Sequence, residues 1–121
     1  MTLNSQVGKY AEDVATEYLK TKGYKILFRN YRKPWGEIDV IASEDGVIVF
    51  AEVKANMSDY INFQPEIRAN RDKMRKVVRT ARTYLAQYDL NDSEWRLDVV
   101  AVTFDKDRGV AKIKHFKNID F

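Results

Sequence analysis

No cysteine occurs among the 121 residues of the chain, which contains only two prolines, five glycines and one histidine. Without cysteine the protein has neither a disulfide framework nor thiolate chemistry, so a bound metal must use oxygen ligands or His115. Oxygen ligands favour a hard cation such as Mg²⁺ or Mn²⁺. With 45% hydrophobic and 32% charged residues, the composition is typical of a folded domain and excludes a disordered chain.

Long apolar runs are missing as well. The first residues, MTLNSQVGKYAED, contain no apolar segment of the kind found in secretory signals, and no later stretch approaches the roughly 18 apolar residues of a membrane span. We therefore expect a cytoplasmic protein that makes no membrane contact. The length predicts a single domain, residues 1–121, with no room for a second. The net charge of +3 is too small to indicate a nucleic-acid ligand by itself.

Hydrophobic periodicity predicts two helices and five strands. Apolar residues recur at helical spacing from Val7 to about Gly23 and again within residues 66–88. Between and after them, β-rich runs bounded by turn residues occupy residues 24–31, 37–43, 47–54, 95–104 and 110–117. Residues 55–65 lack a pattern and predict a loop near the site. The order α-β-β-β-α-β-β predicts an α/β fold with a central mixed five-stranded sheet flanked by helices.

The Asp45-Gly46 pair predicts a type I′ hairpin and with it the register of two strands. If these residues form the loop, Glu44 faces Val47 and the same register places Asp39 opposite Glu52. Two carboxylates opposed at roughly 5 Å repel each other unless a cation lies between them. The pair therefore predicts a metal site, and we prefer it to a solvent-exposed pair because the hairpin is the most apolar of the chain.

The same register places Glu37 opposite Lys54, on the face that carries Asp39 and Glu52. For Glu37, a salt bridge to Lys54 and a role in orienting the metal ligands are equally favoured. Beside two bare carboxylates we expect Lys54 to be protonated, and a bound dication should lower the pKa of Lys54.

These residues resemble the core of a known nuclease superfamily. Gly36-Glu37-Ile38-Asp39 and Glu52-Val53-Lys54 match the D…ExK pattern of the PD-(D/E)XK superfamily, which includes many restriction enzymes and archaeal Holliday-junction resolvases. More closely, the chain resembles a small bacterial endonuclease-like family of unassigned function with a GEID…EVK signature. The resemblance implies a restriction-endonuclease-like core and a metal-dependent nuclease that hydrolyses DNA, including branched or structured DNA.

The resemblance also assigns roles to single residues. Asp39 and Glu52 bind one or two ions of Mg²⁺ or Mn²⁺, and Lys54 positions or activates the attacking water. Ala51 offers its backbone carbonyl as a further ligand. The Gly-x-x-x-Glu pattern of the first helix selects Glu12 as a fourth acidic group.

Some features of the sequence leave the resemblance incomplete. The helical wheel does not distinguish Glu12 from Glu17, although we favour a solvated position for Glu17. Asn56 stands where close relatives often carry an arginine, and the loop before the second helix lacks their Phe-Gly. We therefore expect substrate contacts that differ from those of the family.

The second predicted helix is strongly basic, with Asp72 as the one acid between residues 68 and 82. A charge run is usually a solvated helix face, but a basic helix beside a metal site is the footprint expected for backbone phosphates. We predict contacts to nucleic acid, specifically DNA, from Arg68, Arg71, Lys73, Arg75, Lys76 and Arg79.

Other assignments are less specific. His115 and Asp98 are predicted to be structural, and Trp35 to close an edge of the core. Two functions without catalysis stay open: a nucleic-acid-binding module that has lost turnover, and a structural partner in a DNA repair or processing complex. A homodimer is also left open.

Overall fold

The computed structural model describes residues 3–56, 71–105 and 108–119. The elements are α1 (Leu3–Thr21), β1 (Lys25–Lys33), β2 (Gly36–Glu44), β3 (Val47–Asn56), α3 (Arg71–Gln87), β4 (Trp95–Asp105) and β5 (Val110–Phe116). The α/β class and the order α-β-β-β-α-β-β are therefore confirmed. The predicted loop at 55–65 and the predicted start of the second helix at residue 66 fall largely outside the described residues.

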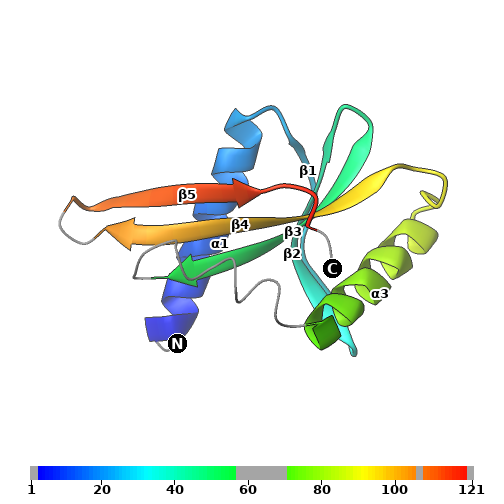
Figure 1. Ribbon diagram of the computed structural model, residues 1–121, viewed down its shortest axis with the longest axis horizontal. Coiled ribbons are helices and arrows are strands. Elements are labelled where there is room, and N and C mark those ends of the chain that lie inside the picture. The colour runs from blue at the N-terminus through cyan, green and yellow to red at the C-terminus, as the bar shows by residue number, and fades with distance from the viewer. Residues whose placement is uncertain (1–2, 57–70, 106–107, 120–121) are drawn as a thin grey trace.

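The five strands form one mixed sheet in the order β1-β2-β3-β4-β5 (Figure 1). β3 and β4 are parallel, and the other neighbouring strands are antiparallel. A parallel pair needs a long crossover, and α3 lies in the segment between these two strands. α1 packs across β1 to β4, whereas α3 packs against β2.

The central strand β3 is buried on both faces. Its side chains alternate: Val49 and Ala51 pack in the cluster that contains the apolar residues of α1, and Ile48 and Phe50 pack in the cluster beneath α3. All four are at most 7% exposed. The near-continuous apolar run at the start of β3 thus belongs to a strand that is covered by a helix on each face.

Gly36 allows β2 to begin directly beneath α3. A Cβ atom at this position would lie 2.7 Å from the hydroxyl oxygen of Thr80 and 3.2 Å from the backbone oxygen of Lys76. Thr80 is fully buried, and its hydroxyl donates a hydrogen bond of 2.7 Å to that same oxygen. Neither atom can move aside freely, so the glycine fixes how closely α3 approaches the sheet.

The Gly36→Ala variant is expected to be about 1–3 kcal/mol less stable than the wild type, because the added methyl group forces β2 and α3 apart. Gly8→Ala is the matched control, since a Cβ at Gly8 in α1 meets no atom within 4 Å and alanine favours a helix by up to about 1 kcal/mol. Urea unfolding of both variants measures the difference. Equal midpoints for the two variants would contradict the close approach.

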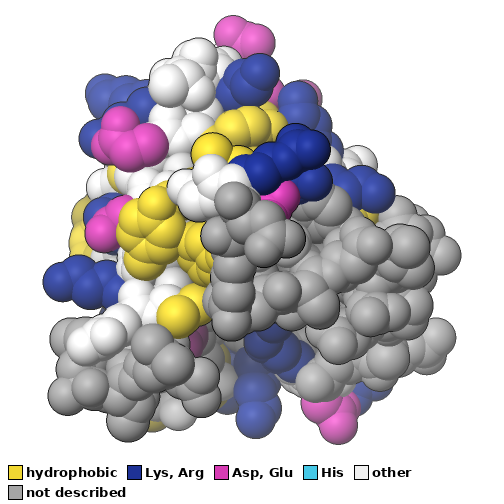
Figure 2. Space-filling view, turned by 90° about the vertical axis from the view of Figure 1, so that its left-hand side faces the viewer, with side chains coloured by type: hydrophobic (Ala, Val, Ile, Leu, Met, Phe, Trp, Pro, Cys, Tyr) yellow, Lys and Arg dark blue, Asp and Glu magenta, His cyan; other side chains and the backbone are white. Residues whose placement is uncertain are grey.

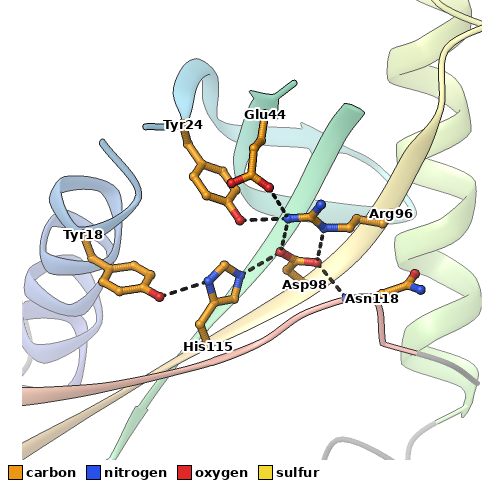
Figure 3. Close-up of polar contacts among 7 residues, drawn as sticks. All are labelled: Tyr18, Tyr24, Glu44, Arg96, Asp98, His115 and Asn118. Atoms are coloured by element: carbon orange, nitrogen blue, oxygen red, sulfur yellow. Dashed lines mark hydrogen bonds and ion pairs between the residues drawn. The ribbon is translucent and has the colours of Figure 1, made fainter. Parts of the chain in front are cut away.

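A polar network surrounds Asp98, near the start of β4, and connects neighbouring parts of the fold (Figure 3). Asp98 accepts hydrogen bonds from Arg96 Nε at 3.0 Å and from the backbone N–H of Asn118 at 2.9 Å, and its Oδ2 lies 2.7 Å from His115 Nε2. Burial alone would raise the pKa of Asp98, but the hydrogen bonds from His115 and Arg96 lower it. Asp98 is thus a satisfied structural carboxylate, as predicted.

The same network also reaches α1, β2 and the segment between α1 and β1. The guanidinium of Arg96 also donates to the hydroxyl of Tyr24 at 2.8 Å and to Glu44 at 3.3 Å. The Nδ1 atom of His115 lies 3.2 Å from the hydroxyl of Tyr18 in α1. His115 therefore connects α1 to β4, which agrees with the predicted structural role (Figure 3).

Neither α1 nor α3, the helices in the part of the chain that the structure describes, combines the length and the hydropathy of a membrane-spanning helix.

Candidate metal centre

The ladder between β2 and β3 ends at Val40 and Ala51. Its pairs run from Glu44 and Val47 to this point in the predicted register, and the two turn residues have positive φ of 51° and 82° as a type I′ turn requires. The next pair in that register would be Asp39 and Glu52. There the carboxylate of Asp39 accepts a hydrogen bond of 2.7 Å from the backbone N–H of Val53. The side chain of Asp39 thus accepts a hydrogen bond from β3 at the point where the backbone ladder between the two strands ends.

β2 also changes its buried face at Asp39. Ile38 packs in the cluster beneath α3, whereas Val40, two residues later, packs with α1. In a regular strand these two side chains would share a face. Asp39 therefore lies where the β2–β3 ladder ends, a place called the gap from here on. There it contacts Glu12 of α1 and the backbone of Val53 in β3.

Three carboxyl groups meet at this gap. Glu12 of α1 and Asp39 share a hydrogen bond, and burial followed by the charge of Asp39 raises the pKa of Glu12. Burial also raises the pKa of Asp39. Glu52 is 11% exposed at its side chain, and burial together with the nearby Asp39 raises the pKa of Glu52 to about 7. Glu17, the alternative to Glu12, is 71% exposed and pairs with Lys20. Of the two glutamates, Glu12 therefore lies beside Asp39, and its role in the site stays a prediction.

Two lysines lie beside the carboxyl groups. Lys73 Nζ of α3 is 3.7 Å from Glu52 Oε2, and Lys73 is hydrogen-bonded to Lys54 of β3. Burial lowers the pKa of Lys54, and the neighbouring Lys73 lowers it further. Burial acts in the same direction on Lys73, but Lys54 and Glu52 raise the pKa of Lys73 above its ordinary value. The ion pair does not keep the pKa of Glu52 low, because burial and Asp39 act on this carboxyl more strongly.

Burial and Lys73 therefore lower the pKa of Lys54 before any metal binds, and the further lowering expected from a bound dication stays a prediction. Sequence reasoning placed Lys73 among the phosphate contacts, so it did not foresee a second ammonium group beside Lys54. A usable signal was present, because Lys73 borders the apolar stripe formed by Met74 and Val77, both buried. A lysine at the edge of that stripe points towards the sheet.

Without a divalent metal, the wild type is expected to lose stability as the pH rises through about 7, and Glu52→Gln is expected to lack this loss. In the folded state Glu52 keeps its proton up to a pKa of about 7, compared with 4.5 ordinarily. Its contribution is complete below about pH 4.5 and lost above about pH 7, an effect of about 3 kcal/mol. Urea unfolding at pH 5 and pH 8 in EDTA measures it. Parallel pH profiles for both proteins would refute the assignment to Glu52.

Two other predicted residues have different neighbours from those expected. The ion pair of Glu37 is with Arg32 of β1, at 3.2 Å, because these residues face each other in the β1–β2 ladder. A salt bridge from Glu37 to Lys54 is not what the structure shows, although the charge of Glu37 contributes to raising the pKa of Asp39. Ala51 is paired with strands on both sides, and its carbonyl as a ligand stays a prediction.

The basic side chains of the predicted helix have different surroundings in the structure. Arg68 and the side chain of Arg71 lie outside the described residues. Lys73 joins the carboxyl groups, and Lys76 is exposed. Arg75 and Arg79 line a groove on α3.

The guanidinium of Arg79 lies 4.1 Å from the centre of the ring of Trp35, a half-buried residue. The indole thus packs against α3, and the edge-closing role of Trp35 stays a prediction. On the face of the molecule where β3 and β4 end, a hydrophobic patch is exposed, and both basic and acidic side chains are interspersed around it (Figure 2).

Asp39 and Glu52 fit a hard divalent cation. Within residues 3–56, 71–105 and 108–119, no cluster of three or more His, Asp or Glu side chains is arranged to hold a metal. Mg²⁺, however, is commonly bound by one or two carboxylates, with water and substrate phosphate as the other ligands. Burial is the largest cause of the raised pKa values of Asp39 and Glu52, and the charge of Asp39 raises the pKa of Glu52 further. Negative charge is thus unfavourable at the gap, and a dication would relieve this.

Comparison with known sequences gives consistent matches. Residues 11–102 match the sequence model of a family described as uncharacterised protein family UPF0102. A UPF0102 protein of Persephonella marina is 37% identical over 114 residues, which cover 94% of this chain and 95% of the relative. A UPF0102 protein of Thermodesulfovibrio yellowstonii is 40% identical over 116 residues, 96% of each chain. A third, from a Sulfurihydrogenibium species, is 43% identical over 99 residues, 81% of this chain and 84% of the relative.

Proposed function

We propose that this chain, which belongs to the uncharacterised protein family UPF0102, is a divalent-metal-dependent nuclease that hydrolyses phosphodiester bonds in DNA. The observation that supports it is the position of Asp39, Glu52 and Lys54 at one gap in the sheet, with the ion pair between Glu52 and Lys73 beside them. The D…ExK pattern and the order of elements are those that the resemblance to PD-(D/E)XK nucleases implies. The resemblance to a superfamily that includes archaeal resolvases adds branched or structured DNA as a candidate substrate.

In this proposal Asp39 and Glu52 hold Mg²⁺ or Mn²⁺. The ion would lower the pKa of a water molecule bound to it and would stabilise negative charge on the phosphoryl oxygens. The backbone N–H of Val53 fixes the orientation of Asp39. The hydrogen bond between Glu12 and Asp39 acts to raise the pKa of Glu12 and to lower that of Asp39, so Glu12 can donate its hydrogen and leave Asp39 as the anionic ligand.

Lys54 is the residue proposed to act on the attacking water. Its lowered pKa increases the share of neutral amine, which a general base needs. As an ammonium group, Lys54 would instead stabilise charge on the phosphate. Lys73 keeps its positive charge beside Glu52, because its pKa is raised. It therefore offers a fixed cation to the substrate phosphate.

A second candidate function is a nucleic-acid-binding module without turnover. The distance of 3.7 Å between Lys73 Nζ and Glu52 Oε2 favours it, because the lysine supplies positive charge at the place proposed for the metal. A structural role in a DNA repair or processing complex is a related alternative. The cytoplasmic location and the homodimer stay predictions.

Divalent ions are expected to raise the melting temperature of the wild type and to have much less effect on Asp39→Asn. At a hundredfold excess over the dissociation constant, ligand binding stabilises the folded state by about 2.7 kcal/mol, or about 10 °C for a domain of this size. Thermal scans with EDTA, Mg²⁺ and Mn²⁺ measure the response. Glu17→Gln is the control, because Glu17 is an exposed carboxylate away from the gap.

Cleavage is tested on single-stranded, duplex, flap and four-way-junction DNA with the same ions. Loss of metal-dependent cleavage in Asp39→Asn, with cleavage kept in Glu17→Gln, is the expected result. An equal thermal response of wild type and Asp39→Asn would count against a metal at Asp39. Metal-independent binding without cleavage of any substrate would favour the second candidate function.

A further inference from the structure

A basic groove runs along the outer face of α3, beside the turn between β1 and β2. It is shallow and has a volume of about 850 Å³. Four of its lining residues are basic, namely Lys33, Arg75, Arg79 and Arg82, and none of its lining residues is acidic. Lys33 comes from β1, so the basic surface includes the β1–β2 turn as well as the helix.

The three arginines of the groove form a stripe along α3. Arg75, Arg79 and Arg82 follow the spacing i, i+4, i+7, which places them on one side of the helix. With a rise of 1.5 Å per residue they span roughly 10 Å. Each strand of duplex DNA carries one phosphate per about 3.4 Å of helix axis, so a stripe of this length along the axis covers about three phosphates of one strand. The spacing therefore suits the regular backbone of a duplex.

Arg79 is held in place by Trp35. The distance of 4.1 Å from its guanidinium to the ring centre is that of a cation–π contact. The indole thus limits the rotamers of Arg79 before any ligand binds. A guanidinium in a fixed position can form two parallel hydrogen bonds with a phosphate. The acid nearest to the stripe in the helix, Asp72, lies 3.9 Å from Arg75, and both side chains are more than 80% exposed, so this pair competes weakly.

The groove faces away from the candidate metal centre. Arg79 follows Lys73, which contacts Glu52, by six residues, which is roughly 9 Å along the axis and about 240° around it. A phosphate in the groove is therefore not the phosphodiester beside Glu52. A ligand that contacts both places must extend around α3.

We infer that this groove binds the sugar–phosphate backbone of duplex DNA, at a point separate from the bond that is cleaved. The inference rests on the proposed nuclease function for its choice of DNA, and it adds that the substrate contains a double-stranded segment. The groove holds this segment by three arginines and Lys33, without reading the base sequence.

The test compares two double variants that remove the same charge. Arg79→Ala with Arg82→Ala changes the groove, and Lys112→Ala with Lys114→Ala changes two exposed residues of β5, at the opposite edge of the sheet from β1. Fluorescence anisotropy with a labelled 20-base-pair duplex, in EDTA and at several KCl concentrations, gives the affinity and its salt dependence. Unlabelled single-stranded DNA of the same length and polyglutamate serve as competitors.

The groove variant is expected to bind the duplex at least about tenfold more weakly at low salt, with a salt slope smaller by about two, one for each lost phosphate contact. The β5 variant should keep the slope of the wild type. Equal losses in both variants would overturn the inference, as would polyglutamate or single-stranded DNA competing as well as duplex. Because binding is measured in EDTA, this result is independent of cleavage. Binding through the groove without any cleavage would leave the inference standing and remove the nuclease function. Cleavage without a contribution of the groove to binding would overturn the inference and leave the nuclease function standing.

Discussion

Replacement of Lys54 by alanine is expected to reduce the single-turnover rate of DNA cleavage by about 10²–10⁴-fold, the usual contribution of a general acid or base. Lys54 lies beside Asp39 and Glu52 without being an oxygen ligand, and its pKa is lowered by burial and by Lys73. Its loss should therefore leave the metal response of the melting temperature nearly intact. Glu52→Gln is expected to lose the metal response and cleavage together.

An arginine at the same position separates the two roles of Lys54. Lys54→Arg keeps a positive charge but cannot act as a base, because a guanidinium stays protonated. If Lys54 is the base, the arginine variant should be about as slow as the alanine variant. If Lys54 is an electrostatic clamp, the arginine variant should keep much of the rate. Single-turnover kinetics on a substrate that the wild type cleaves decides between them. Cleavage by Lys54→Ala at the wild-type rate would exclude both roles and favour the binding module.

Removal of Asp98 is expected to destabilise the protein by about 3–5 kcal/mol, the range found when one member of a buried ion pair is removed. Asp98 is fully buried at its side chain, Arg96 is 17% exposed and His115 is 5% exposed. Asp98→Ala leaves the guanidinium of Arg96 with a much weaker set of partners, and it removes the acceptor for the N–H of Asn118.

Asp13→Ala is the matched control for this prediction. Asp13 forms an ion pair of 2.7 Å with Arg29, but the two side chains are 51% and 37% exposed, and such pairs contribute about 0–1 kcal/mol. Urea unfolding at neutral pH, followed by circular dichroism, measures both losses. A loss below about 1 kcal/mol for Asp98→Ala would show that the network in Figure 3 contributes little to stability.

The β2–β3 register could be predicted because it depends on local chemistry. Asp45 and Gly46 tolerate the positive φ of a type I′ turn, and the two-residue loop then determines each pair as far as Val40 and Ala51. The end of the ladder at Asp39 could not be predicted in the same way. It depends on β2 changing the face that it buries, which requires α1 and α3 to be in place on opposite sides of the sheet.

The position of Lys73 shows the same limit. The sequence predicts a basic helix, but the rotation of that helix against the sheet decides which of its cations reaches Glu52. Gly36 determines part of this geometry, because the close contact with Thr80 sets how near α3 lies to β2. A glycine before Glu37 gives no sign of that contact in the sequence alone. The partner of Glu37, Arg32 of β1, depends on the register of the β1–β2 hairpin, and the turn residues Pro34 and Trp35 are not a pair that predicts a type I′ turn.

The topology of the sheet also determines the order in which the charges of the gap come together during folding. β1, β2 and β3 are joined by short turns, so their pairing closes small loops, whereas every pair in the parallel ladder of β3 and β4, such as Val53 and Val100, is 47 residues apart. Contacts between residues far apart in the chain form late, because closing a long loop has a larger entropic cost. Asp39 and Glu52 lie on the early hairpin, and Lys73 arrives with α3. We therefore expect the two carboxylates to come together beside Lys54, which lies on the same hairpin, before Lys73 reaches them.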